Sequence, residues 1–262
     1  MDLPPLGEGS GRTAGSSRTK SQAGRDRSTA GASAHGPVGV VLAGGASRRM
    51  GRDKAALVVA GKSLAERAAE RLREICSEVC LADGGRGLLP GCPSLRDGPG
   101  EGPAAGILGA AAAYRGRSLL VLACDLPRVP VALLAALAQS AQPASLAPGA
   151  PPSQPSDHGC DWAVPRWSRG IEPLCALYGP RALSALAAQV ARGVAAPHRL
   201  AAAGELSVCY FDDGKIGGFG NPEELFLNLN TPSDFALWAR QCQTESAAAS
   251  ASTAPGTPGP GG

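Results

Sequence analysis

The sequence feature that most constrains the fold is a short apolar run, residues 38–43, which ends in the glycine pair Gly44 and Gly45. An apolar run bounded by glycines is typical of a buried strand in a parallel sheet. In open α/β sheets, ligands bind at the carboxyl ends of the strands, and adjacent glycines let the backbone approach a phosphate and present its N–H groups. The segment therefore predicts a parallel sheet with an anion site at the end of this strand.

Predicted strands and helices alternate along residues 37–240. Ser63 begins a capping-box pattern, Ser-Leu-Ala-Glu, and Pro103 stands where a helix begins. Such alternation is typical of βαβ units, so we expect a single α/β domain with a doubly wound, mostly parallel sheet and one reversed strand region in its second half. The expected strands are residues 38–43, 79–82, 118–123, 162–164, 174–178 and 207–211, and the expected helices are residues 63–74, 103–114, 181–190, 232–240 and one that begins at Pro130.

The segments outside this core have the composition of disordered chain. The sequence contains 36 glycines and 23 prolines in 262 residues, and neither residues 1–36 nor residues 241–262 show apolar periodicity. Segments that bury little apolar surface stay disordered, so we expect a disordered leader at 1–36 and a disordered tail at 241–262. Residues 139–158 are rich in proline and small polar side chains, and they predict a long surface loop within the domain.

Charge, hydropathy and cysteine usage exclude several classes of protein. A net charge of +3 without a long block of Lys and Arg does not favour a nucleic-acid partner. No apolar stretch is long enough for a membrane span, and no signal-like apolar run lies near the amino terminus. The eight cysteines include no Cys-x-x-Cys pair and accompany only three histidines, so zinc-ligand spacing is absent. We therefore expect a cytoplasmic protein whose cysteines are buried, reduced thiols.

Basic residues follow the glycine pair. Arg48, Arg49, Arg52 and Lys54 come soon after Gly45 and supply enough positive charge to neutralise a triphosphate. The chain has only four lysines against 21 arginines, so a lysine at this place does not simply reflect composition. The spacing is neither that of a P-loop nor that of the dinucleotide-binding fingerprint. Taken alone, the segment is either a phosphate-binding loop or a flexible glycine-rich turn with solvated arginines.

Residues 42–54 resemble the signature loop of the molybdenum cofactor guanylyltransferases, a family of molybdopterin nucleotidyltransferases. That loop reads Leu-Ala-Gly-Gly-x-Ser-x-Arg-Met-Gly-x-Asp-Lys, and every fixed position is matched here. Four further segments are similar to motifs of this family and follow in the same order along the chain. They are residues 97–106 (DGPGEGPAAG), 123–127 (ACDLP), 172–178 (EPLCALY) and 226–232 (FLNLNTP).

The resemblance covers about residues 38–240 and implies the Rossmann-like fold of the nucleotidyltransferases. It implies a reaction in which GMP passes from GTP to molybdenum–molybdopterin, pyrophosphate leaves, and the guanine dinucleotide form of the cofactor is made. The implied metal cofactor is Mg²⁺. The implied partners are GTP and molybdenum–molybdopterin, followed by recipient molybdoenzymes or their chaperones, with neither nucleic acid nor membrane among them.

The resemblance also implies a set of site residues. Arg49 and Lys54 would hold the β- and γ-phosphates, and with Asp125 they are the expected catalytic residues. Asp125 is the expected Mg²⁺ ligand, because it follows a buried strand and hard oxygen ligands suit that ion; otherwise it would cap the next helix. Residues 172–178 would line the acceptor half of the cleft. The residues expected to bind nucleotide, metal or acceptor are Leu42, Ala43, Gly44, Gly45, Lys54, Asp97 (a second carboxylate on the nucleotide side), Asp125, and Asn228 and Asn230, which would alternate along a strand and address the pterin.

Two features depart from the family pattern. Some members carry an Asn after the second strand that contacts the nucleotide, whereas this chain has Ala82 followed by Asp83. The proline-rich residues 139–158 have no counterpart in the pattern. We therefore assign no nucleotide contact to the loop after the second strand.

Three other functions stay open from the sequence alone. They are cytidylyl transfer to the same cofactor, nucleotidyl transfer to another small phosphorylated acceptor such as a sugar phosphate or phospholactate, and nucleotide binding without catalysis. Gly44 favours GTP, because the cytidylyl relatives more often have Leu-Ala-Ala-Gly at this place. The presence of Lys54, Asp97 and Asp125 disfavours a non-catalytic protein.

Overall fold

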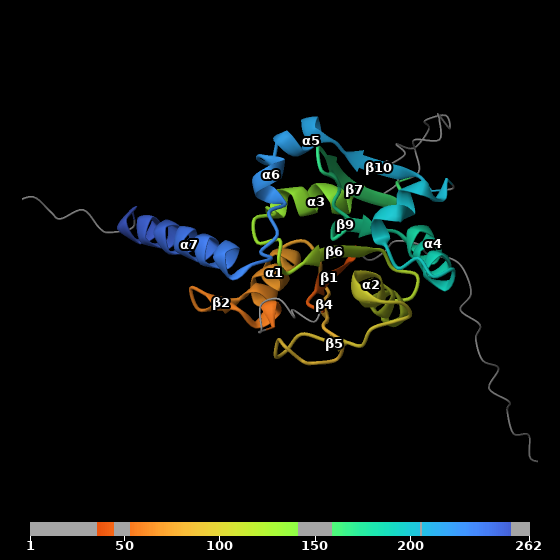
Figure 1. Ribbon diagram of the computed structural model, residues 1–262, viewed down its shortest axis with the longest axis horizontal. Helices are drawn as coiled ribbons and strands as arrows, with labels where there is room; N and C mark the ends of the chain where they lie inside the picture. The colour runs from red at the N-terminus through yellow and green to blue at the C-terminus, as the bar shows by residue number, and fades with distance from the viewer. Residues whose placement is uncertain (1–35, 45–52, 141–158, 205, 253–262) are drawn as a thin grey trace, which may run out of the picture. The chain divides into compact units, whose positions relative to one another are not determined.

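Residues 36–44, 53–140, 159–204 and 206–252 are described by a computed structural model (Figure 1), and they belong to one compact unit. Its centre is an eight-stranded sheet with the strand order β10-β7-β9-β6-β1-β4-β5, in which β8 pairs with β7. The strands of this sheet are β1 (Val38–Leu42), β4 (Val79–Ala82), β5 (Ser94–Leu95), β6 (Leu119–Ala123), β7 (Trp162–Trp167), β8 (Gly170–Ile171), β9 (Cys175–Tyr178) and β10 (Val208–Phe211).

The sheet is mostly parallel. β1 pairs in parallel with β4 and β6, β4 with β5, and β10 with β7. β9 runs antiparallel to both of its neighbours, β6 and β7, and β8 is antiparallel to β7. The expected mostly parallel sheet with a reversed region in the second half is confirmed.

Helices lie on both faces of the sheet, with α1 and α3 on one face and α2 and α4 on the other (Figure 1). The capping box at the start of α1 is present, because the Ser63 hydroxyl accepts a hydrogen bond from the Glu66 N–H and the Glu66 carboxylate accepts one from the Ser63 N–H. The helices are α1 (Leu64–Arg73), α2 (Gly102–Ala113), α3 (Val131–Gln139), α4 (Pro180–Ala191), α5 (Asp213–Gly217), α6 (Pro222–Leu225) and α7 (Pro232–Ser252), with 3-10 turns η1 (Lys54–Ala56) and η3 (Pro197–Ala203).

The two central strands supply the middle of the core, since every residue of β1 and β6 is buried. Full burial of one Val or Leu side chain contributes about 1.5–3 kcal/mol. Gly39 in β1 lets α1 cross the sheet closely, because a Cβ there would lie 3.0 Å from Leu72 Cβ and 3.1 Å from Val79 Cγ2. Close packing at this point fixes α1, and with it the hairpin and turn that precede the helix, against the central strands.

Several short elements were not expected from the sequence. They include η1 and the two-stranded antiparallel hairpin of β2 (Val58–Val59) and β3 (Lys62–Ser63). None of them is long enough for hydrophobic periodicity to reveal it. The first residue of η1 is Lys54, which is one of the expected site residues.

The predicted end of the last helix is wrong, because α7 continues to Ser252, into the residues expected to form the tail, instead of ending at Arg240. This segment is alanine-rich and contains no glycine or proline that would stop the helix. The first half of α7 is anchored on the domain: Trp238 is buried, and the Arg67 guanidinium of α1 lies 5.6 Å from its ring centre. Residues 1–35, 141–158 and 253–262, where we expect the leader, most of the loop and the end of the tail, lie outside the described residues.

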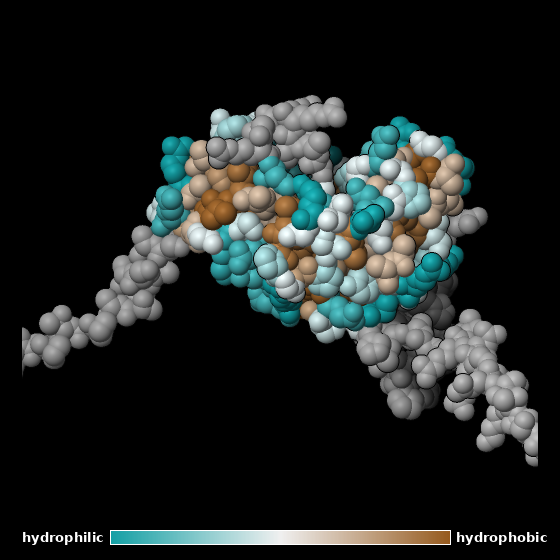
Figure 2. Space-filling model, turned by 90° about the horizontal axis from the view of Figure 1, so that it is seen from below, coloured by the Kyte–Doolittle hydropathy of each residue, from teal (hydrophilic) through white to brown (hydrophobic). Residues whose placement is uncertain are grey.

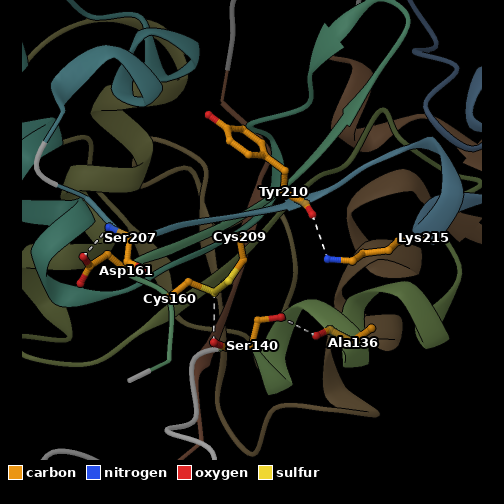
Figure 3. Close-up of a disulfide and its surroundings, with 8 residues drawn as sticks. All are labelled: Ala136, Ser140, Cys160, Asp161, Ser207, Cys209, Tyr210 and Lys215. Carbon is orange, nitrogen blue, oxygen red and sulfur yellow. Dashed lines mark hydrogen bonds between the residues drawn. A yellow bond between two sulfur atoms is a disulfide. The ribbon is translucent and has the colours of Figure 1, made fainter. Parts of the chain in front are cut away.

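The expectation of reduced thiols is also wrong for one pair, because Cys160 and Cys209 form a disulfide (Figure 3). Cys160 lies two residues before β7 and Cys209 lies in β10, its parallel neighbour, so sheet formation brings the two Cα atoms to 5.7 Å across 49 residues of sequence. The Ser140 carbonyl accepts a hydrogen bond from the Cys160 N–H at 3.0 Å. The free cysteines Cys76, Cys80, Cys92, Cys124 and Cys175 are buried, as expected, and Cys242 is half-buried.

The surface is mixed in character. Figure 2 shows one face on which hydrophobic residues occur in small groups separated by hydrophilic ones. Within the described part of the chain, no helix combines the length and apolarity that a bilayer crossing needs.

Candidate active site

The carboxyl ends of the three central strands meet at one edge of the sheet. Leu42 of β1 is in register with Ala82 of β4 and with Ala123 of β6. The backbone continues this alignment, because the Ala43 N–H donates to the Ala82 carbonyl and the Cys124 N–H donates to the Leu42 carbonyl, both at 3.1 Å. The loops after these strands therefore start side by side, as expected for a ligand site in an α/β sheet.

The structure brings three of the expected site residues together at this edge. Lys54 Nζ donates a hydrogen bond to Asn230 Oδ1 at 2.8 Å and lies 3.7 Å from Asp125 Oδ2. The Lys54 and Asp125 side chains keep 18% and 24% of their surface exposed, so a ligand can reach both. The contacts fix where these residues lie, and their roles stay predictions.

The other predicted loop residues are placed in part. Leu42 and Ala43 are buried, and Gly44 is exposed beyond the end of β1, where a Cβ would lie 3.4 Å from the Ala82 carbonyl oxygen. Gly45 and Arg49 fall outside the part of the chain that the structure describes.

A capped turn places Lys54. Asp53 precedes η1, and its Oδ1 accepts a hydrogen bond from the Ala55 N–H at 3.1 Å. An Asp at this position satisfies one of the backbone donors that a helix start leaves free. In the Asp-Lys pair of the signature, Asp53 therefore caps the turn, and Lys54 extends from the turn to Asn230 and Asp125.

Asp125 lies in a turn that is held by its surroundings. Burial raises the pKa of the Asp125 carboxyl, while the Lys54 ammonium opposes that shift. The Leu229 N–H donates to the Asp125 carbonyl at 3.1 Å, and the Arg71 guanidinium of α1 donates to the carbonyls of Leu126 and Pro127. Asp125 does not cap the next helix, because the N-cap of α3 is Pro130 and makes no side-chain capping bond.

Asn228 and Asn230 lie in a loop before α7, so the expected strand at this place is wrong. The reason is local: the N–H groups of Asn230 and Thr231 donate to Asp234 Oδ2, and this cap bends the chain into α7. Burial still alternates along this loop, because Leu229 is buried, whereas Asn228 before it is half-buried and Asn230 after it is exposed. Both amides thus flank a core residue at the edge where Lys54 lies.

Asp97 occupies a different part of the edge. It is exposed, and its carboxylate oxygens lie near Gly84 in the loop after β4 and near Gly106 of α2. Glycine at 109 is required there, because a Cβ would lie 2.2 Å from the Arg96 carbonyl oxygen. Among the described residues, no hydrogen bond or ion pair joins Asp97 to Lys54 or Asp125, and its place on the nucleotide side stays a prediction.

Glu172 is a neighbour of Asp125 to which sequence reasoning gave no individual role. β6 pairs with β9 with Leu122 opposite Cys175, and the Ala123 N–H donates to the Leu174 carbonyl at 2.8 Å. Glu172 precedes β9 and Asp125 follows β6, so this strand pairing brings their two segments to the same end of the sheet. Burial raises the pKa of Glu172 to about 7, and the Asp125 charge adds to this rise, while the hydrogen bond from the Leu174 N–H opposes it. The sequence signal that could have identified this neighbour is its position, because Asp125 follows β6, Glu172 precedes β9, and these two strands pair.

The donor set suits a hard cation that also binds phosphate. No group of three His, Cys, Asp or Glu side chains that could hold a metal occurs in residues 36–44, 53–140, 159–204 or 206–252. Mg²⁺ is commonly bound by one or two carboxylates together with the phosphates of the substrate. The accessible Asp125 carboxylate fits this pattern.

Comparisons with known proteins agree with this geometry. A family model described as "MobA-like NTP transferase domain" matches residues 39–205. The probable molybdenum cofactor guanylyltransferase of Pelotomaculum thermopropionicum is 30% identical over 202 residues, which cover 75% of this chain and 88% of that protein. The molybdenum cofactor guanylyltransferase of Cereibacter sphaeroides is 32% identical over 205 residues, which cover 76% of this chain and 93% of that protein.

Solved structures share the architecture. The molybdopterin-guanine dinucleotide biosynthesis protein A of Archaeoglobus fulgidus is similar with a TM-score of 0.63 and 25% identity, over 79% of this chain and 99% of that one. The 2-C-methyl-D-erythritol 4-phosphate cytidylyltransferase of Thermus thermophilus, at 19% identity and a TM-score of 0.53, shares the fold alone, over 79% of this chain and 99% of its own. The fold, the site at the strand ends and the sequence relatives lead to one conclusion: the chain belongs to the MobA-like NTP transferase family.

Proposed function

We propose that this protein transfers GMP from GTP to molybdenum–molybdopterin and releases pyrophosphate. The observation that carries the proposal is the meeting of Lys54, Asp125 and Asn230 at the carboxyl ends of the central strands. The relatives named as molybdenum cofactor guanylyltransferases, each similar over about three quarters of this chain, support the choice of nucleotide and acceptor.

In this proposal the triphosphate lies across the strand ends and the protein acts by position and charge. Lys54 donates to the phosphates that leave as pyrophosphate, and the Gly44 backbone lets them approach the end of β1. Arg49, in the same signature loop, adds a second positive charge. Transfer by direct attack of the acceptor phosphate on the α-phosphate needs no covalent enzyme intermediate, because orientation and charge neutralisation lower the barrier.

Asp125 is the proposed ligand of Mg²⁺. When bound, the ion supplies Lewis-acid stabilisation of negative charge on the phosphates. The protein's own part is to hold the Asp125 carboxylate at the end of β6, which the Leu229 N–H and the Arg71 guanidinium do by fixing the backbone of its turn.

The acceptor half of the site is proposed to lie toward the loop before α7 and the start of β9. Asn228 and Asn230 offer amide donors and acceptors that suit a pterin. Glu172 lies just before β9, where the charge of Asp125 adds to the rise of its pKa. The product would then pass to recipient molybdoenzymes or their chaperones in the cytoplasm.

A nucleotide-choice assay tests the proposal. Purified protein, Mg²⁺ and molybdenum-loaded molybdopterin are incubated with GTP or CTP, and pyrophosphate release and the dinucleotide product are measured. We expect GTP to be used far better than CTP. Equal or faster release with CTP assigns cytidylyl transfer instead, and nucleotide binding without any pyrophosphate release overturns the catalytic proposal.

A further inference from the structure

Arg86 lies in the loop between β4 and β5, outside the motifs that carry the family resemblance. Its guanidinium contacts two segments that are separate in sequence. One nitrogen donates to the carbonyl of Ala43, immediately after β1, and another pairs with the carboxylate of Asp53. Arg86 therefore joins the end of the central strand to the turn that begins with Lys54.

The loop that presents Arg86 is itself rigidly organised. Asp83 is almost fully buried and accepts hydrogen bonds from the N–H groups of Gly85, Arg86 and Leu88 and from the Ser94 hydroxyl. Burial acts to raise the pKa of Asp83, but these hydrogen bonds outweigh it and hold the pKa below its usual value. The Arg86 Nε also donates to the Asp83 carbonyl at 2.6 Å. The guanidinium is thus aimed by its own loop toward β1.

Asp53 links Arg86 to the site through its two carboxylate oxygens. Oδ1 caps η1 by accepting from the Ala55 N–H, and Oδ2 pairs with Arg86. The first residue of η1 is Lys54, whose ammonium reaches Asn230 and Asp125. A change in the position of Asp53 moves the turn, and the turn carries the lysine.

We propose that Arg86 is a positioning residue for nucleotidyl transfer: it holds Asp53 against the end of β1 and so fixes the turn from which Lys54 reaches the triphosphate. This inference rests on the proposed function in one respect, the binding of nucleotide phosphates by Lys54. An exposed ion pair contributes little to folding stability. The guanidinium here contacts a backbone carbonyl as well as a carboxylate, so its loss should disturb geometry at the site more than stability.

The test compares Arg86→Ala, Arg86→Lys, Asp53→Asn and the double variant Arg86→Ala/Asp53→Asn. Asn keeps the capping oxygen at position 53 and removes the charge. The matched control is Arg117→Ala, because Arg117 also contacts one carboxylate, of Glu78 at 2.8 Å, and one carbonyl, of Gly36 at 2.9 Å, but at the amino ends of the strands. Nucleotide affinity is measured by calorimetry without acceptor, kcat and KM by pyrophosphate release, and stability by thermal unfolding.

Arg86→Ala is expected to lower kcat/KM for the nucleotide by about ten- to a hundredfold, the range that a small misplacement of a catalytic group causes. Asp53→Asn should cause a similar loss, the double variant should lose little more than either single variant, and Arg86→Lys should recover part of the activity. Arg117→Ala should keep affinity and kcat/KM within about twofold of the wild type, because its contacts lie away from the strand ends that bind ligands.

Two results overturn the inference: Arg86→Ala indistinguishable from Arg117→Ala in affinity and kcat/KM, or losses in the double variant that equal the product of the single losses. The proposed function is tested separately, by the nucleotide-choice assay on the wild-type protein. If the wild type prefers another nucleoside triphosphate, the same variants are compared with that nucleotide, so the two conclusions succeed or fail separately.

Discussion

The Lys54 ammonium lies 2.8 Å from the amide oxygen of Asn230, although 176 residues separate them in the sequence. The same ammonium is 3.7 Å from the Asp125 carboxylate, which is longer than a direct charge-assisted hydrogen bond. Lys54 is therefore oriented by a neutral amide and only loosely paired with the acid. This arrangement leaves the positive charge available to an incoming phosphate and keeps Asp125 available to a cation.

Replacement of Lys54 tests that arrangement. Lys54→Ala should weaken GTP binding by about tenfold or more, since a preorganised charged contact to the phosphates is lost. Excess Mg²⁺ should not restore the affinity, because the ion occupies a different place from the ammonium. Lys62→Ala is the control, as Lys62 forms a surface pair with Glu70; calorimetric titration that shows equal losses for both variants would contradict the role of Lys54.

Asp125→Asn should separate folding from turnover. The side chain caps no helix and burial already disfavours its charge, so the melting temperature should stay close to that of the wild type. Turnover should fall by about a hundredfold or more, the size typical of a lost electrostatic contact in an active site. Thermal unfolding, GTP affinity and turnover are measured together. A destabilised protein with wild-type turnover would assign Asp125 a structural role only.

The raised pKa of Glu172 predicts that the stability of the protein depends on pH. The pKa of Glu172 is about 7 in the folded protein, compared with an ordinary value of 4.5. Between pH 4.5 and pH 7 the folded state therefore binds a proton that the unfolded state has lost. The free energy of unfolding should therefore fall as pH rises from about 4.5 to 7, and this contribution should stay lost above pH 7.

Glu172→Gln removes this titration and keeps an acceptor for the Leu174 N–H. The variant should show a smaller fall in stability across that window and should be more stable than the wild type at pH 8. Each pKa unit corresponds to about 1.4 kcal/mol, so the difference is at most a few kcal/mol. Urea unfolding at a series of pH values measures it, and parallel pH profiles for the two proteins would refute the raised pKa.

Trp238 should anchor α7. Trp238→Ala is expected to destabilise the protein by about 3 kcal/mol, because a large buried side chain leaves a cavity beside α1. The neighbouring Leu237 is 51% exposed, so Leu237→Ala should change stability by less than about 0.5 kcal/mol. Deleting residues 245–262 beyond the anchor should also cost little. Denaturant unfolding of the three variants decides whether the helix is held at this point.

Local signals in the sequence predicted much of the fold. The buried strands β1, β4 and β6 appear as apolar runs, and the Ser63 capping box marks the start of α1, because these features depend on neighbours along the chain. Short elements such as η1 and β8 escaped prediction, because a few residues carry no periodicity. The composition of residues 241–262 does not predict the continuation of α7, because low complexity is typical of disorder, whereas the alanines favour a helix.

The sequence by itself determined the chemistry available to this protein: the signature of residues 42–54, the acid after β6 and the asparagines before α7, each defined by residue type and spacing. Only the tertiary structure decided which of these groups meet. Lys54 contacts Asn230 and Asp125, the Asp125 charge raises the pKa of Glu172, Arg86 pairs with Asp53, and Cys160 bonds to Cys209. These pairings cross tens to hundreds of residues, and the order and direction of strands in the sheet set them, which no local pattern encodes.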